Sequence, residues 1–183
     1  MGSPQRMIVG LLAAATALFP AQWAWAHVGD TVEAFNTGPM VTTGKVAYLE
    51  PFSLKNKTLN GVTYRATAAY QKACQIMLVV ANGHITSEVF AIPVVGDRNV
   101  LKAERELLDA FLQQSGIPSQ FHAQVRARMV DAMDQEVPPK EFGGLMVQAM
   151  LVPAEVPLLV IAVARDMASL PLPRPALHGE VQQ

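Results

Sequence analysis

Hydrophobic and polar positions along this chain predict a β-hairpin near residue 82. Two apolar-rich runs, 74–81 and 84–92, are separated by Asn82-Gly83. A two-residue connection of this type favours a type I′ turn. With Ala81 opposite His84 and regular pairing beyond them, one face of the hairpin would be apolar and would pack in the core: Cys74, Ile76, Leu78, Val80, Ile85, Val89 and Ala91. The same pairing would place Glu88 on the other, mixed face with His84, but roughly 13 Å along the strand from it and too far for a shared metal ion.

The residues before this hairpin favour extended structure. Positions 62–70 alternate between apolar and polar side chains, which predicts a half-buried strand. Thr42, Thr43 and Val46 favour a further strand over 40–49, because β-branched residues fit a pleated backbone, and Pro51 would end it. Residues 27–39 show no clear period, so an irregular entry segment is expected there, with room for a short strand.

Two amphipathic helices are predicted in the middle of the chain. The first covers 100–115 with Asn99 as its N-cap, and the second runs from Ser119 to about Gln135. Helical spacing places one apolar stripe on each, formed by Val100, Leu101, Leu107, Leu108, Phe111 and Leu112 in the first and by Phe121, Val125, Met129 and Met133 in the second. Lys102 with Glu106, and Arg105 with Asp109, would form exposed ion pairs one helical turn apart. The Gly-Ile-Pro connection predicts an αα-hairpin that needs a sheet to cover its stripes.

Residues 145–165 are apolar enough to raise the question of a membrane anchor. Gln148, Pro153, Glu155 and Pro157 interrupt the run, whereas a membrane helix needs about 20 consecutive apolar residues. Two buried strands, 145–152 and 158–164, fit this pattern better. The fold class expected from the whole pattern is α+β, with a mainly antiparallel sheet of about six strands and one αα-hairpin packed on it.

The first 26 residues have the pattern of a secretory signal peptide. Arg6 precedes the apolar run 7–19, and Ala24-Trp25-Ala26 is typical of a cleavage site. We therefore expect a signal peptide at 1–26, a single domain at 27–169 and a Pro-rich disordered tail at 170–183. This predicts a periplasmic or secreted protein with no stable membrane span after cleavage.

Charge and cysteine content narrow the functional classes. The chain of 183 residues has 14 basic and 15 acidic side chains, and removal of Arg6 leaves the remainder with a net charge of about −2. Such a balance argues against binding to nucleic acid or to an anionic membrane. Cys74 is the only cysteine, so no intramolecular disulfide can form, and we expect it to pack in the core.

Histidines are the candidate metal ligands. Cleavage after Ala26 would place His27 at the new N-terminus, where its amine and imidazole could chelate Cu(II). His84 and His122 are the candidate partners of His27 in such a copper site. Taken singly, His84 would be a solvated turn residue, His122 a helix-surface residue, and His178 part of the tail.

No catalytic signature accompanies these histidines. The sequence has no Gly-x-Ser-x-Gly elbow, no phosphate-binding loop and no dinucleotide fingerprint. We expect an exported non-enzymatic accessory or binding module for a protein partner, a second copy or a small apolar ligand. Its surplus apolar residues would serve that contact: Met146, Met150, Leu158, Leu159 and Ile161. Copper binding and an enzyme site assembled only in the folded chain are the alternatives, and a polar pocket joining His122 to acidic residues would favour the latter.

Overall fold

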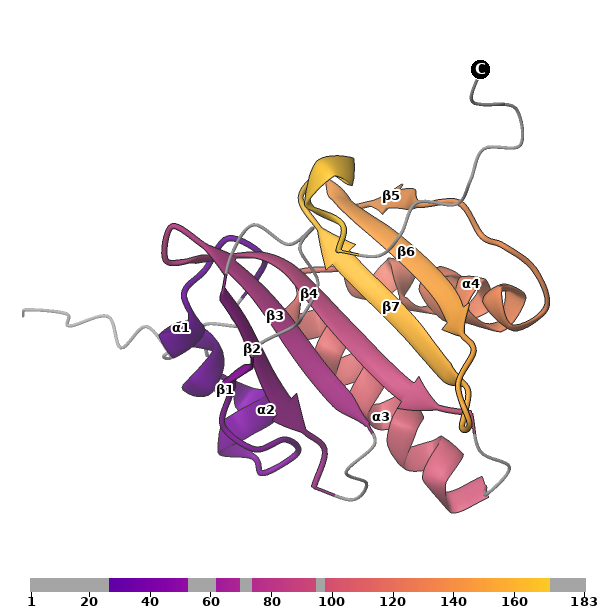
Figure 1. Ribbon diagram of the computed structural model, residues 1–183, viewed down its shortest axis with the longest axis horizontal. Coiled ribbons are helices and arrows are strands. Elements are labelled where there is room, and N and C mark those ends of the chain that lie inside the picture. Colours follow the sequence, from indigo (N-terminus) through magenta and orange to yellow (C-terminus); the bar gives the residue numbers. More distant parts are fainter. Residues whose placement is uncertain (1–26, 53–61, 70–73, 95–97, 172–183) are drawn as a thin grey trace, which may run out of the picture.

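A seven-stranded antiparallel sheet forms the centre of the protein (Figure 1). The computed structural model describes residues 27–52, 62–69, 74–94 and 98–171. The strands, in sheet order, are β1 (Glu50–Phe52), β2 (Val62–Thr67), β3 (Gln75–Ala81), β4 (His84–Pro93), β7 (Leu158–Ala164), β6 (Leu145–Val152) and β5 (Lys140–Phe142). Every adjacent pair is antiparallel, which confirms the α+β class predicted from the sequence.

The sheet has seven strands where about six were expected, because the two edge strands were not predicted and the predicted strand 40–49 does not form. β1 and β5 have three residues each, too few to show a period in the sequence. Pro51 was expected to end a strand, but it lies inside β1. An edge strand accepts proline because one side of its backbone has no partner strand.

The two predicted apolar strands near the C-terminus are confirmed as β6 and β7. β7 pairs with both β4 and β6, so it lies in the interior of the sheet. Each face of β7 is covered, which explains why its sequence is apolar without alternation. No helix among the residues that the structure describes is long and apolar enough to cross a membrane.

The predicted hairpin turn is also confirmed. Asn82 and Gly83 have φ angles of 53° and 80°, as a type I′ turn requires, and Ala81 pairs with His84. Beyond the turn, however, the predicted register is wrong. Val80 faces Ile85 while Val79 faces Ser87, so β4 carries one extra residue in a β-bulge.

This bulge exchanges the two faces of β4. Glu88 pairs with Leu78 and Phe90 with Ile76, which places Glu88 and Phe90 on the core face. Val89 and Ala91, expected in the core, lie on the opposite face of the sheet. A shift of one residue has this effect because successive side chains of a strand point to opposite faces.

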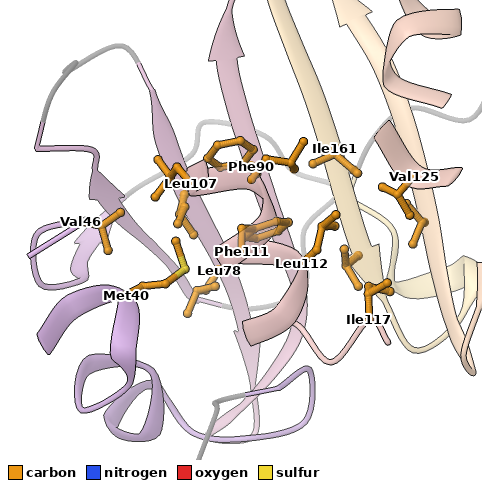
Figure 2. Packing of buried hydrophobic residues seen from close by; sticks show 14 of the residues in the cluster. Met40, Val46, Leu78, Phe90, Leu107, Phe111, Leu112, Ile117, Val125 and Ile161 are labelled. Carbon is orange, nitrogen blue, oxygen red and sulfur yellow. The ribbon is translucent and has the colours of Figure 1, made fainter. Parts of the chain in front are cut away.

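The helices cover one face of the sheet. α3 (Arg98–Gln114) contacts β4, whereas α4 (His122–Asp134) packs on β6 and β7 after the short 3₁₀ helix η1 (Ser119–Phe121) (Figure 1). In the core between helices and sheet, the rings of Phe90 and Phe111 stack with centroids 5.3 Å apart (Figure 2). The core-facing stripe of α3 is confirmed from Leu107 to Leu112.

The middle of the predicted α4 stripe, Val125 and Met129, is buried as expected, but its two ends differ. Its buried residues are His122, Val125, Met129 and Ala132, whereas Met133 is 42% exposed. The prediction used a strict four-residue spacing, which drifts around the helix because one turn takes about 3.6 residues. Phe121 instead packs beside the ring of Phe142, with centroids 5.8 Å apart.

The N-terminal part of the domain forms two short helices, one in the segment 27–39 that was expected to be irregular and one where the strand 40–49 was expected to begin. α1 (Val32–Asn36) begins at Thr31, whose side chain accepts a hydrogen bond from the Ala34 amide. α2 (Pro39–Thr42) replaces the strand predicted over 40–49, of which only a bridge from Val46 to Ala68 is extended. Proline at the first helical position favours this start, and it outweighs the extended preference of the threonines.

The sheet face away from the helices is apolar as well. Its small cluster is Val89, Ala91, Val160 and Ala162, with Met77, Met150, Val152, Leu158 and Leu170 partly buried around it. Of the five residues assigned to a contact surface, Leu159 and Ile161 are instead buried towards the helices. Met146, Met150 and Leu158 remain half-buried. Cys74 is buried in the core, as expected.

Candidate functional site

An open cleft of about 870 Å³ lies where the C-terminal end of α3 meets the N-terminal segment. Five parts of the chain line it: His27 and Val28; Asp109 and Gln113 of α3 with the following Ser115; Gly116 to Ser119 and His122; Gly144 and Leu145; and Arg165. Gly116 and Gly143 both have positive φ angles. These glycines allow the tight turns that bring the separate segments to one place.

His122 and Asp109 meet at this cleft. The His122 Nδ1 atom lies 3.8 Å from the Asp109 Oδ1 atom, and the side chain of Arg126 forms an ion pair with the same carboxylate. Asp109 was expected to pair with Arg105, but in the folded chain its carboxylate meets Arg126 of α4 instead. The expected Lys102–Glu106 pair does form, at 4.0 Å and fully at the surface.

The surroundings of His122 decide which ring nitrogen is protonated. Its Nε2 atom lies 2.9 Å from the Ile117 carbonyl oxygen, which can only accept, so Nε2 carries a hydrogen. In the neutral ring, Nδ1 is then an unprotonated acceptor on the side of Asp109. His122 is 9% exposed, so its prediction as a helix-surface residue is wrong.

His27 is held by two hydrogen bonds at the opposite wall of the cleft. Its Nδ1 atom donates to the Gln114 carbonyl oxygen at 2.8 Å, and its main-chain nitrogen donates to Asp30 Oδ2 at 2.7 Å. A copper chelate at an N-terminal histidine would need those same two nitrogens, because only Nδ1 is close enough to the amine to close a small ring with the metal. Copper binding would therefore have to displace both contacts.

The three proposed metal ligands do not form one cluster. His84 is exposed at the hairpin turn, as expected, and its Nδ1 atom donates to the Gly29 carbonyl oxygen at 3.0 Å. His27 and His122 both line the cleft. Within the described ranges, no group of three or more His, Cys, Asp or Glu side chains is arranged to hold a metal ion. The copper site stays a prediction.

Beneath the cleft, Ser115 connects to a buried carboxyl group. The Ser115 hydroxyl lies 2.5 Å from Glu88 Oε2 and 2.9 Å from the Phe111 carbonyl oxygen. Burial raises the pKa of Glu88 to about 8; the Ser115 hydrogen bond partly offsets this increase, and the negative charge of Asp30 adds to it. Glu88 is therefore mostly protonated at neutral pH.

The hydrogen-bond geometry agrees with a protonated Glu88. A hydroxyl has one hydrogen, and the Phe111 carbonyl oxygen can only accept. When Glu88 is protonated, its carboxyl donates to Ser115 Oγ and the Ser115 hydrogen goes to Phe111. When Glu88 is ionised, that single hydrogen has to serve two acceptors. The protonated state thus satisfies this buried pair better than the ionised state.

Arg165 supplies a cation at the mouth of the cleft. Its side chain is exposed and donates one long hydrogen bond, 3.5 Å from Nη2 to the Val28 carbonyl oxygen. It lies over Gly29, where an added Cβ would come within 2.0 Å of the guanidinium. Among the described residues, no carboxylate lies within ion-pair distance of Arg165.

Sequence reasoning missed four of these groups. Asp109 and Arg165 have ordinary surroundings in the sequence, and Ser115 resembles any residue at a helix end. Glu88 was placed on the wrong face because the bulge in β4 leaves no local signal. Only His27 and His122 were singled out beforehand.

Comparison of the chain with models of protein families, with curated proteins and with solved structures gives no match. The function must therefore be inferred from the cleft.

Proposed function

We propose that the protein is an exported, non-enzymatic binding module that holds a small organic anion in this cleft. The observation that carries the proposal is the charge distribution of the lining. Asp109 is paired with Arg126, whereas Arg165 has no carboxylate partner among the described residues. Two imidazoles, those of His27 and His122, also line the cleft. Such a lining favours a carboxylate or a similar anion.

Apolar walls define the rest of the ligand. Val28, Ile117, Pro118 and Leu145 line the cleft beside the polar groups. A volume of about 870 Å³ lies within the range typical of small-molecule sites. We therefore propose a carboxylate with an aliphatic or aromatic body, in place of the purely apolar ligand expected from composition.

Export is supported by the sequence alone. The positive, apolar and small-residue regions at 1–26 occur in the order of a secretory signal peptide. We propose that the chain from His27 onwards is the working protein and that it binds its ligand in the periplasm or outside the cell.

A panel of small carboxylates, from acetate to benzoate and medium-chain fatty acids, tests this function. Each is titrated into the chain 27–183, with ¹H–¹⁵N spectra recording shifts around the cleft. Arg165→Gln should weaken binding by about ten- to a hundredfold, since a charge-assisted contact contributes about 1.5–3 kcal/mol. Lys102→Gln, an exposed cation on α3 away from the cleft, is the matched control and should bind as the parent does.

Two outcomes would contradict the proposal. One is that no member of the panel shifts resonances of the cleft residues. The other is binding that Arg165→Gln and Lys102→Gln weaken equally, which would indicate general electrostatic attraction instead of a site.

The pairing of His122 with Asp109 favours a second candidate, general acid–base catalysis. His122 Nδ1 is the unprotonated ring nitrogen that could take a proton from a ligand, and the Asp109 carboxylate lies 3.8 Å from it. No described hydroxyl or thiol contacts its ring, and the Ser115 hydroxyl is occupied by Glu88 and Phe111. Binding is therefore better supported. Hydrolysis of simple esters that disappears in His122→Gln would favour the enzyme.

A further inference from the structure

The segment 27–30 is fixed to the hairpin by main-chain hydrogen bonds. The Gly29 amide donates to the Ile85 carbonyl at 2.7 Å, and the Ile85 amide donates to the Asp30 carbonyl at 2.7 Å. The Asp30 amide donates to the His27 carbonyl at 2.9 Å. The place of the His27 nitrogen is therefore set by the domain itself.

The acceptor that faces this nitrogen is a carboxylate. Asp30 Oδ2 accepts from the His27 nitrogen at 2.7 Å, and Asp30 is half-buried. In the uncleaved chain that nitrogen is a neutral amide. Hydrolysis of the Ala26–His27 bond would add OH to the Ala26 carbonyl carbon and hydrogen to the His27 nitrogen, which then takes up a proton and becomes an ammonium group.

We propose that the domain captures the amino group released by cleavage after Ala26, with Asp30 as its counter-charge. The contact changes from an amide hydrogen bond to a charge-assisted one without any movement of the chain. Processing at this bond then makes the folded domain more stable than any form that carries residues before His27.

The charged and titratable groups around the contact are compatible with an added positive charge. The negative charge of Asp30 contributes to the raised pKa of the buried Glu88. His84 contacts the Gly29 carbonyl oxygen, and Arg165 lies over Gly29. An ammonium on His27 would partly cancel the effect of the Asp30 charge on Glu88. This inference does not depend on the ligand of the cleft.

The histidine itself contributes a second anchor. Its Nδ1 donates to the Gln114 carbonyl oxygen at the end of α3. The ring and the main-chain nitrogen are thus held from two different elements, the segment 27–30 and α3. With the ring hydrogen-bonded to Gln114 and the main-chain nitrogen to Asp30, His27 is held where its ammonium group would meet the Asp30 carboxylate.

A four-protein cycle tests the proposal. The chain 27–183, released without extra residues, is compared with the chain 26–183, which keeps Ala26, each with Asp30 or with Asp30→Asn. With Asp30, removal of Ala26 should lower the unfolding equilibrium constant roughly two- to fivefold, the size of a partly exposed ion pair. With Asp30→Asn, which keeps an oxygen acceptor, that difference should vanish. The control is Asp131→Asn, on the exposed side of α4, which should leave the stability difference between the two chain lengths unchanged.

The proposal is overturned if both chain lengths are equally stable with Asp30, or if the difference persists in Asp30→Asn. Should Asp30→Asn fail to fold, a salt series on the two Asp30 proteins decides. An ion pair weakens as salt rises to 1 M, where screening acts over about 3 Å. A difference that salt does not reduce would overturn the proposal equally.

Discussion

Glu88 makes the stability of this protein depend on pH in a direction that can be worked out. Burial raises its pKa in the folded chain from 4.5 to about 8. Between those values the folded state holds a proton that the unfolded state has released, so the free energy of unfolding falls as pH rises. The contribution is fully present below pH 4.5 and is lost as pH rises to about 8.

The magnitude follows from the same two values. A slope of about 1.4 kcal/mol per pH unit over this window gives about 5 kcal/mol in all. Domains of this size have a total stability of about 5–15 kcal/mol. The ionisation of one side chain would therefore remove a large part of the stability at alkaline pH.

Glu88→Gln is the perturbation that isolates this effect. Glutamine is neutral at every pH and nearly the same size, and its amide can still bond to Ser115. Urea unfolding at a series of pH values from 5 to 9 should show a falling free energy of unfolding for the parent and a flatter curve for the variant. By pH 9 the variant should be more stable than the parent by several kcal/mol.

Glu106→Gln is the control, because Glu106 is an exposed glutamate on α3. Its free energy of unfolding should depend on pH in the same way as that of the parent. Any stability that other groups lose at alkaline pH is common to all three proteins. Parallel curves for the parent and Glu88→Gln would refute the reasoning, since they would show that Glu88 does not hold its proton in the folded state.

Two further predictions concern the turn beside the cleft and the core. Gly143→Ala should be less stable than Gly144→Ala. Both residues have positive φ, so alanine costs about 1–2 kcal/mol of strain at either position. Only at Gly143 would the added Cβ also meet a rigid neighbour, 2.6 Å from Pro118 Cδ. Equal losses in thermal unfolding would contradict that clash. The buried Cys74 should react with a thiol reagent only as fast as the chain unfolds, so its rate should rise with urea; rapid labelling of the native protein would contradict its burial.

The parts of the fold that could be predicted from the sequence are those decided by neighbouring residues. Asn82-Gly83 determines a type I′ turn because both positions tolerate positive φ. The apolar runs of β6 and β7, bounded by Pro153 and Pro157, gave strand limits that the structure confirms. The apolar stripe of α3 likewise depends only on helical spacing.

Other features needed contacts from distant parts of the chain. Pro39 favours the start of helix α2 locally, but the burial of Met40 and Val41 in the shared core also supports a helix where Thr42 and Thr43 favour a strand. The bulge in β4 has no local pattern, yet it decides that Glu88 points into the core and Val89 away from it.

The candidate site divides in the same way. The sequence alone singled out His27, through the expected cleavage site, and His122, through residue type. Only the tertiary structure brought them to one cleft with Asp109 and Arg165, since α3, α4, β7 and the N-terminal segment approach one another there. Local spacing sets turns and stripes, whereas the charge and protonation of a site depend on burial and on neighbours remote in sequence, which exist only once the chain has folded.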